Sequence, residues 1–547
     1  MSIANLSRET SSDWQSGSYD LHHTGFSPQN RINRDNLNDL ELKWVYQIPE
    51  NPFPEGELRT AQGIQASPLV VKGITYVATN YNRVIALDAL NGEEIWSYQV
   101  DLKAFFTKPW WAGWARQHSI IYYRDAIYML ASDGTLYSFD PSTGAVKFTI
   151  PDTFRDIPGN KGRYFSESAP AFYNDIVVVG AGGGGWWNGR GYVAAYDLKT
   201  RELLWRWFAS PPAEGDPDWD REAGKGNIEP YHGDWGEGGI PMGGGVVWGR
   251  HTVDEETGIL YILTSNSCVG PYDASLRPGP HLYASSVVAL DVRSGEMIWY
   301  YQVTPHDLNG HQPAWSPILA TAKIEGIVKK VVIVASKGGY IYVFDSKTGG
   351  LIYEPVKIGP SQVNAPNTNA GSAAKLFFSQ KDILDKVYCP GEQGGIAAGR
   401  AFAYNTIYVP YQRCGTRYTR GGKIMMDGGE IEGYDLDFFV GKEDLPEGWD
   451  NTSSLYAIDA SDGRVKWNFD MPARYQSASL SVSGGVVYAV DRSGNFWAVD
   501  AHTGQLLRRI KLGGLGQAGI AIGADSSGNM MLFAPVGNIV MALGFPM

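Results

Sequence analysis

The sequence predicts an all-β protein, an eight-bladed β-propeller whose blades are four-stranded antiparallel sheets. Three observations lead to this prediction: a short phrase that recurs along the chain, runs of alternating or β-branched residues between its copies, and abundant turn formers, with 66 Gly and 30 Pro in 547 residues. Units of this kind pack side by side and close radially into a propeller.

The recurring phrase contains an acid, a turn and then an apolar residue, as in Asp88, Gly92 and Trp96. Seven copies begin at Asp88, Asp140, Asp197, Asp291, Asp345, Asp459 and Asp500, and residues 37–44 add an eighth unit. The glycine supplies a positive φ for a tight hairpin turn, and only the copy at Asp197 lacks it. Several of the tryptophans are expected to pack between neighbouring blades: Trp44, Trp96, Trp205, Trp299 and Trp467.

Runs of alternating or β-branched residues separate the copies and are predicted to form strands. They are residues 66–78, 120–130, 169–179, 260–263, 331–334, 399–408 and 485–490. Two stretches break this rhythm, residues 208–245 and 415–450, and both are too long for hairpin turns. We expect them to be long loops near an axial site. The whole chain, residues 1–547, is predicted to be one propeller domain.

Composition narrows the class of partner. The net charge of −12 argues against nucleic acid or an anionic membrane, and no apolar stretch is long enough to span a bilayer. The predicted partner is therefore a small molecule, and homo-oligomer formation stays open. The amino terminus lacks the apolar core of a signal peptide, which predicts a cytoplasmic protein, or a periplasmic one if Met1 starts a mature chain. Cys268, Cys389 and Cys414 are predicted to be buried thiols, with a pair between the last two as the alternative.

Four segments resemble the pyrroloquinoline-quinone (PQQ) dependent alcohol dehydrogenases, a quinoprotein family. They are residues 14–33, residues 63–71 (Gly-Ile-Gln-Ala-Ser-Pro-Leu-Val-Val), residues 276–279 (Leu-Arg-Pro-Gly) and residues 299–307 (Trp-Tyr-Tyr-Gln-Val-Thr-Pro-His-Asp). The resemblance covers nearly the whole chain and implies the same eight-bladed fold. It also implies PQQ on the propeller axis, stacked between a tryptophan and a ring of two adjacent cysteines. A Ca²⁺ or lanthanide ion and a basic Asp complete that site.

The resemblance assigns roles to several residues of this chain. Trp248 matches the stacking tryptophan and Asn266 the metal-binding asparagine, although blade packing and a plain turn remain the alternatives. Arg116 and Lys337 match cations that contact the quinone oxygens. Three further positions are altered: Trp110 and Trp111 fall near the adjacent cysteines, and Gln65 replaces an acidic contact.

The chain departs from the family where the chemistry is done. No carboxylate lies between Gly180 and Gly191, where the family has its metal-binding Glu. The catalytic Asp falls on Gly310, and the additional Asp of lanthanide enzymes falls on Gln312. A lone asparagine cannot hold a hard cation, so a divalent or lanthanide metal is doubtful.

An atypical base is therefore expected. Glu167, Asp307 and His311 are the candidate catalytic residues, because carboxylates and imidazoles transfer protons and lie close to the predicted axis. A histidine cluster for a metal, from His232, His306 and His311, stays open. The predicted function is oxidation of an alcohol-type molecule by a quinoprotein-like dehydrogenase. Two alternatives remain: a non-redox acid–base enzyme acting on an aromatic or apolar molecule without PQQ, and a non-catalytic binding propeller.

Overall fold

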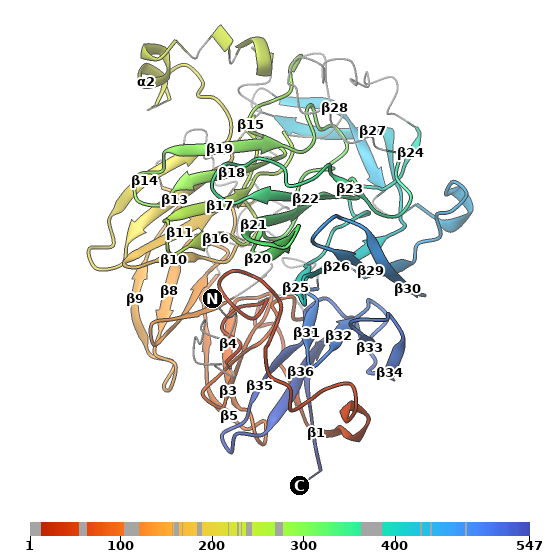
Figure 1. The fold of residues 1–547 in the computed structure, drawn as a ribbon. Helices are drawn as coiled ribbons and strands as arrows, with labels where there is room; N and C mark the ends of the chain where they lie inside the picture. Colours follow the sequence, from red (N-terminus) through yellow and green to blue (C-terminus); the bar gives the residue numbers. More distant parts are fainter. Residues whose placement is uncertain are drawn as a thin grey trace.

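The computed structural model confirms the all-β prediction, since eight four-stranded antiparallel sheets follow one another along the chain (Figure 1). The structure describes residues 13–53, 63–102, 120–155, 157, 164–166, 168–182, 189–216, 218–226, 229–230, 232–236, 243–267, 277–362, 385–426, 429–437, 440–475 and 478–546, with the side chains of 420–436 left aside. The first strands of most consecutive blades contact one another, which places them around the axis of a propeller.

The first four blades occupy the amino-terminal half of the chain. They are β2 (Leu69–Val71), β3 (Ile74–Ala78), β4 (Arg83–Asp88) and β5 (Glu94–Gln99); β6 (Ile121–Tyr123), β7 (Ala126–Leu130), β8 (Leu136–Phe139) and β9 (Val146–Ile150); β10 (Ala171–Tyr173), β11 (Ile176–Gly180), β13 (Tyr192–Asp197) and β14 (Leu203–Phe208); and β16 (Thr252–Asp254), β17 (Ile259–Leu263), β18 (Ser286–Asp291) and β19 (Met297–Gln302).

The other four blades complete the ring. They are β20 (Ile318–Ile324), β21 (Ile327–Ala335), β22 (Tyr340–Asp345) and β23 (Val356–Lys357); β25 (Ala401–Ala403), β26 (Thr406–Gln412), β29 (Ser453–Asp459) and β30 (Val465–Met471); β31 (Ser481–Ser483), β32 (Val486–Val490), β33 (Asn495–Asp500) and β34 (Leu506–Lys511); and β35 (Ala521–Ala524), β36 (Met530–Val536) and β37 (Ile539–Gly544) with β1 (Glu41–Gln47).

The predicted strand runs and the predicted eighth unit need refinement. The run 66–78, for example, holds both β2 and β3, joined by a turn at Lys72 and Gly73. Residues 37–44 supply only the outermost strand of a blade, because β1 pairs antiparallel with β37 after the short 3₁₀ turn η2 (Leu37–Asp39). The two ends of the chain thus meet in one blade, where red β1 lies near blue β36 and β35 (Figure 1).

The recurring phrase forms the turn between the third and fourth strands of a blade. Its glycine N–H donates to the carbonyl of the aspartate four residues earlier, as from Gly92 to Asp88 at 2.8 Å, so the turn is longer than the tight hairpin we expected. The aspartate side chain accepts the N–H two residues on, as Asp88 Oδ1 does from Leu90 at 2.7 Å.

Each of these turns receives the aromatic side chain of the preceding blade. The indole of Trp96 donates to Pro141 O at 2.8 Å, and a Cβ placed on Gly144 (φ +70°) would lie 2.5 Å from its Cδ2. The same docking joins Trp44 to Gly92, Trp205 to Gly295, Trp299 to Gly349 and Trp467 to Gly504. The interpretation of these tryptophans as blade-packing residues is confirmed.

The copy without glycine keeps the same backbone. Arg201 takes the glycine position with φ +68°, and its N–H donates to Asp197 O at 2.8 Å. Its guanidinium lies 5.3 Å from the ring centre of Phe148 on the preceding blade. A cation–π contact therefore takes the place of the ring-on-glycine contact at this junction.

The segment after Trp14 runs across the first strands of many blades. Trp14 pairs with Val70 of β2, Gln15 O accepts from Tyr122 of β6, and His22 O accepts from Leu319 of β20. Thr24 O then accepts from Phe402 of β25, and Ser27 donates to Val482 O of β31. One strand-like segment thereby fastens several blades to one another.

The two long stretches carry local structure of their own. Residues 208–245 include α2 (Trp219–Gly224) and β15 (Gly243–Gly244), which pairs with β12 (Gly189–Arg190). Residues 415–450 form the hairpin of β27 (Thr416–Met426) and β28 (Gly429–Asp437), extended by β24 (Val387–Tyr388) and followed by η7 (Lys442–Asp444). Among the described residues, no helix has the length and apolarity to cross a membrane.

Candidate functional site

The connections of the blades lie at two ends of the propeller. Because neighbouring strands are antiparallel, the phrase turns share one end with the turns that join first and second strands. The opposite end carries the turns after the second strands and the connections between blades. Trp248, Asn266, Gly310 and Lys337 all lie at this second end, since they follow β15, β17, β19 and β21.

Three loops converge there. Loop 306–312 connects β19 to β20, turn 336–339 connects β21 to β22, and loop 389–395 leads toward β25. Lys337 N donates to Gln312 O at 3.1 Å, which joins the first two loops. The third approaches so closely that a Cβ on Gly395 (φ +58°) would lie 1.8 Å from Lys337 O, so this position requires glycine.

Lys337 and Trp248, two of the predicted cofactor-binding residues, lie close together. Lys337 is buried, and its Nζ lies 5.8 Å from the ring centre of the partly buried Trp248. Trp315 packs edge-on against Trp248, with ring centres 5.9 Å apart. The site thus combines an aromatic wall with a cation over its face.

Gln312 links Lys337 to Gly310. In the amide orientation that satisfies both of its groups, its nitrogen donates to Gly310 O at 2.6 Å and its oxygen accepts from Lys337 Nζ at 3.1 Å. Gly310 has φ +68°, a conformation that glycine adopts without strain. The amide therefore fixes the ammonium group relative to the loop that carries Gly310.

Glu392 is the residue that sequence reasoning missed. Its side chain is buried and fills the space beside Gly310, because a Cβ on Gly310 would lie 2.5 Å from Glu392 Cγ and 3.2 Å from its Cδ. Its backbone N–H donates to Thr416 Oγ1 at 2.9 Å, which holds the loop against β27. Burial raises the pKa of Glu392 to about 7, against the opposing effect of the Lys337 charge.

Asp307 and His311 are both brought to this cluster, and both are engaged. Asp307 Oδ2 accepts from Ser285 Oγ at 2.8 Å, and its Oδ1 accepts from the N–H groups of Asn309 and His311 at 3.2 and 2.9 Å. His311 Nε2 lies 2.8 Å from Pro390 O. A carbonyl can only accept, so Nε2 carries the proton, and burial lowers the pKa of the imidazole.

Gln65 and Asn266 lie at the same end of the propeller. Gln65 is buried, and its Oε1 has no hydrogen-bond partner in the part of the chain that the structure describes. Asn266 is partly buried, and its carbonyl accepts from Gly245 N at 3.0 Å, which ties it to the strand leading to Trp248. The other predicted site residues, Trp110, Trp111, Arg116 and Glu167, lie outside the described residues.

His306 is held by a backbone carbonyl and packs against His281. His306 Nδ1 lies 2.8 Å from Gly279 O, and its ring centre is 4.5 Å from that of His281. Burial lowers the pKa of both imidazoles. The described residues contain no group of three His, Cys, Asp or Glu side chains that could hold a metal ion.

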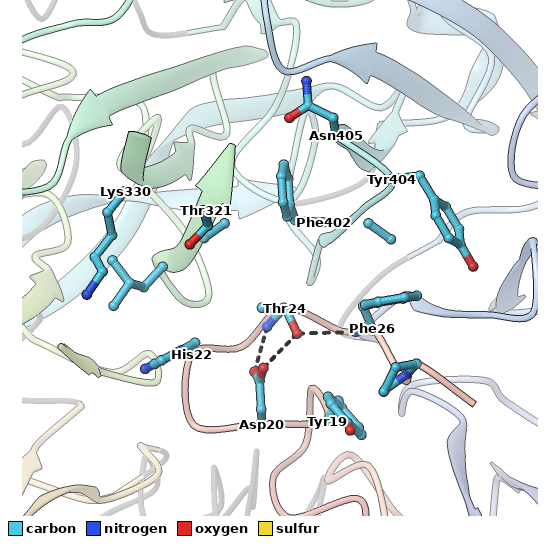
Figure 2. Close-up of a pocket in the computed structure, with 14 residues that line it drawn as sticks. Tyr19, Asp20, His22, Thr24, Phe26, Thr321, Lys330, Phe402, Tyr404 and Asn405 are labelled. Atoms are coloured by element: carbon cyan, nitrogen blue, oxygen red, sulfur yellow. Dashed lines mark hydrogen bonds between the residues drawn. The ribbon is translucent and has the colours of Figure 1, made fainter. Parts of the chain in front are cut away.

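A separate pocket lies at the other end of the strands. It has a volume of about 440 Å³ and is lined by the amino-terminal segment, β20 and β25. Figure 2 shows Phe402 and Tyr404 on one side of it and, on the other, Thr24 hydrogen-bonded to Asp20 at 2.9 Å. Lys330 in this pocket lies near the start of β21, whereas Lys337 follows its end, so the pocket and the Lys337 cluster are distinct.

Fold and site together define an eight-bladed propeller with aromatic and ionisable side chains at one end of its axis. Residues 14–369 match the family model described as "Glucose/ethanol/alcohol dehydrogenase, beta-propeller domain". The chain therefore belongs to the family of PQQ-dependent alcohol dehydrogenases. Residues 448–540 also match the model of the outer membrane protein assembly factor BamB, which covers the last blades only.

The chain is similar along most of its length to a quinohemoprotein alcohol dehydrogenase and to a lupanine 17-hydroxylase. The chain is 28% identical over 522 residues to a quinohemoprotein alcohol dehydrogenase of Comamonas testosteroni, covering 90% of this chain and 68% of that protein. It is 26% identical to the lupanine 17-hydroxylase [cytochrome c] of a Pseudomonas species, covering 92% and 70%. The crystal structure of the Comamonas testosteroni enzyme shares the fold, with a TM-score of 0.78, 24% identity and 99% and 81% coverage.

Proposed function

We propose that this chain oxidises an alcohol-type small molecule at the Lys337 end of the propeller axis, with PQQ as the oxidant and with an atypical base and metal site. Membership of the family supports the reaction class. The observation that carries the proposal is the cluster itself, in which the Lys337 ammonium lies over the Trp248 ring beside the buried carboxyl group of Glu392.

The described residues suit PQQ in shape and charge. PQQ is a flat quinone that bears carboxylates, and Trp248 offers an aromatic face for stacking. Lys337 supplies a positive charge beside that face, and Gln65 Oε1, which has no partner among the described residues, can accept a hydrogen bond from a ligand. Lys337, Trp248 and Gln65 would hold the cofactor, which supplies a two-electron oxidant when bound.

We expect the metal requirement of this chain to differ from the one that the family resemblance implies. Asn266 would be one oxygen ligand, but a hard cation needs several oxygen ligands with negative charge. In place of a metal, the fixed Lys337 charge would polarise a quinone oxygen, because the Gln312 amide holds the ammonium in place. We therefore expect oxidation to proceed without added Ca²⁺ or lanthanide.

The test is a titration of the purified protein with PQQ, followed by tryptophan fluorescence and thermal unfolding, and then dye reduction with primary and secondary alcohols. We expect saturable quenching, a raised Tm and alcohol-dependent dye reduction. Trp248→Leu should weaken PQQ binding at least tenfold, since stacking is lost. Trp44→Phe is the control, because Trp44 lies on the outermost strand of a blade and should bind PQQ unchanged.

A second candidate function is acid–base catalysis on an aromatic or apolar molecule without PQQ. The observation that favours it is the buried carboxyl group of Glu392 beside an aromatic wall, a combination that transfers protons without a cofactor. A titration that gives neither quenching nor thermal stabilisation, with or without Ca²⁺, lanthanide or Cu²⁺, would reject PQQ oxidation and favour this alternative.

A further inference from the structure

We propose that Glu392 is the proton acceptor of this site and that it delivers, from loop 389–395, the carboxylate that the family resemblance assigns to the position of Gly310. This inference rests on the proposed function and assigns the base within it. Its geometric support is the mutual exclusion between the Glu392 side chain and any side chain at position 310.

The space beside Gly310 admits one side chain only. A Cβ on Gly310 would lie 2.5 Å from Glu392 Cγ, and the next atom that does not belong to Glu392 is Gln312 Oε1 at 3.4 Å. Distances below 3.0 Å do not occur between such carbons, so a side chain at 310 would displace Glu392. The resemblance matches Gly310 to the catalytic Asp, and Glu392 therefore occupies the place where that side chain would begin.

Neighbouring groups hold Glu392 in this place without using its carboxyl group. The loop is fixed by the Glu392 N–H to Thr416 Oγ1, by Gly391 N to Cys414 O at 2.8 Å and by the contact of His311 with Pro390 O. In the part of the chain that the structure describes, the carboxyl oxygens of Glu392 make no hydrogen bond to another side chain or to the backbone. No described group therefore competes with a substrate hydroxyl for these oxygens.

Asp307 and His311, the other two candidate bases in this cluster, are less suited to accept the substrate proton. Both oxygens of Asp307 already accept hydrogen bonds that shape loop 306–312, which makes Asp307 a positioning residue. His311 donates a hydrogen bond from its Nε2–H to Pro390 O and so joins the two loops. Removing either side chain should shift Glu392, whereas removing the Glu392 carboxyl group should remove the base itself.

The charges around Glu392 suit proton transfer at neutral pH. Burial raises its pKa, the ammonium of Lys337 lowers it, and the carboxylate of Asp307 raises it, with the result near 7. Burial lowers the pKa of both imidazoles of loop 306–312, His306 and His311. A base that titrates near the working pH combines a useful ionised fraction with a strong tendency to take a proton.

The step balances as follows. The Glu392 carboxylate would take the hydroxyl proton of the alcohol as the C–H bond breaks and the carbon–oxygen bond becomes a carbonyl, giving an aldehyde or ketone and protonated Glu392. PQQ, when bound, would supply the two-electron oxidant that accepts the hydride. Glu392 then returns its proton to solvent.

The first test compares wild type, Glu392→Gln and Glu392→Asp in dye-linked alcohol oxidation across pH. Glu392→Gln keeps the size of the side chain and should lower kcat by 10²- to 10⁴-fold with little change in KM. Glu392→Asp should recover part of the rate, and the rise in rate near pH 7 should disappear in the Gln variant. An active wild type with an equally active Gln variant would overturn the role of Glu392 alone, whereas a wild type that oxidises no alcohol overturns both proposals.

The second test needs no cofactor. Infrared difference spectra of the wild-type protein should show a carboxyl band that titrates near pH 7 and that is missing from Glu392→Gln. Gly310→Ala should lower the Tm of wild type at least twice as much as that of Glu392→Ala, because Glu392→Ala removes the Cγ that the new Cβ would strike. A carboxyl band that is the same in Glu392→Gln, or equal losses in the two backgrounds, would contradict the placement of Glu392.

Discussion

Replacing Gly144 with alanine tests how the repeat builds the propeller. Gly144 has φ +70°, and an added Cβ would lie 2.5 Å from both Cδ2 and Cε3 of Trp96 on the preceding blade. Two costs add. Alanine in the left-handed region costs roughly 1–2 kcal/mol, and a methyl group forced into a packed contact costs roughly 1–3 kcal/mol. We therefore expect Gly144→Ala to lower the free energy of unfolding by about 2–5 kcal/mol.

Gly326→Ala is the matched control. Gly326 has φ +83°, and its Cβ would have no atom within 4 Å, so only the backbone cost of roughly 1–2 kcal/mol applies. A third comparison uses Trp96→Ala, in which the methyl group no longer meets a ring. In the Trp96→Ala background, Gly144→Ala should then lower the free energy of unfolding by no more than Gly326→Ala does. The difference between its effects in wild type and in Trp96→Ala measures the contact of the methyl group with the Trp96 ring.

Urea unfolding followed by far-UV circular dichroism gives the free energy of unfolding of each variant. The urea midpoints are compared with one common value for the dependence of this free energy on urea concentration. The reasoning would be refuted if Gly144→Ala lost no more stability than Gly326→Ala, or if the loss were the same with and without the Trp96 ring. Either result would mean that the aromatic residues do not rest on the glycines of the next blade.

Three further predictions concern other sites. Arg201→Gly should stabilise the protein by at most about 1 kcal/mol in the same urea assay, because glycine relieves the left-handed backbone strain at the expense of the weaker contact with Phe148. A destabilised variant would instead show that the cation–π contact dominates. Because burial raises the pKa of Glu392 to about 7, the folded state holds this proton more tightly than the unfolded state. The free energy of unfolding of wild type should therefore fall by about 3 kcal/mol as pH rises from about 4.5 to 7. Glu392→Gln should lack this fall, and a Gln variant with the same pH profile as wild type would refute the prediction. Cys389 and Cys414 are buried free thiols, and burial raises the pKa of each to about 12. Neither thiol should therefore react with a disulfide reagent at pH 8 until the protein unfolds. Rapid reaction of the native protein would contradict their burial.

The sequence was informative about the fold because the repeat is a local signal. The phrase marks turns whose backbone geometry depends on nearby residues, and its tryptophans dock on the next copy of the same phrase. The prediction of a tight hairpin was wrong in detail, because the glycine closes a five-residue turn. The stretch 415–450, expected as a loop, forms a hairpin, since Thr416–Met426 pairs antiparallel with Gly429–Asp437.

The site was less predictable because it depends on contacts between distant loops. The resemblance led to Trp248 and Lys337 through matching positions, and the structure places them together. It could not lead to Glu392, since the proximity of residues 310 and 392 arises only when two blades pack. The one signal in the sequence was negative: position 310, to which the resemblance assigns the catalytic Asp, is a glycine and leaves space beside it for a side chain from another loop.

Moving the carboxylate back to loop 306–312 tests the central claim most directly. The measurement is the rate of alcohol-dependent dye reduction by PQQ-loaded Glu392→Ala and by the double variant Gly310→Asp with Glu392→Ala. Aspartate tolerates the left-handed conformation of position 310, and Glu392→Ala removes the atoms that would strike it. We predict that Glu392→Ala loses at least 100-fold in rate and that the double variant recovers at least tenfold of it. A double variant no faster than Glu392→Ala, or a Glu392→Ala variant as fast as wild type, would contradict the account.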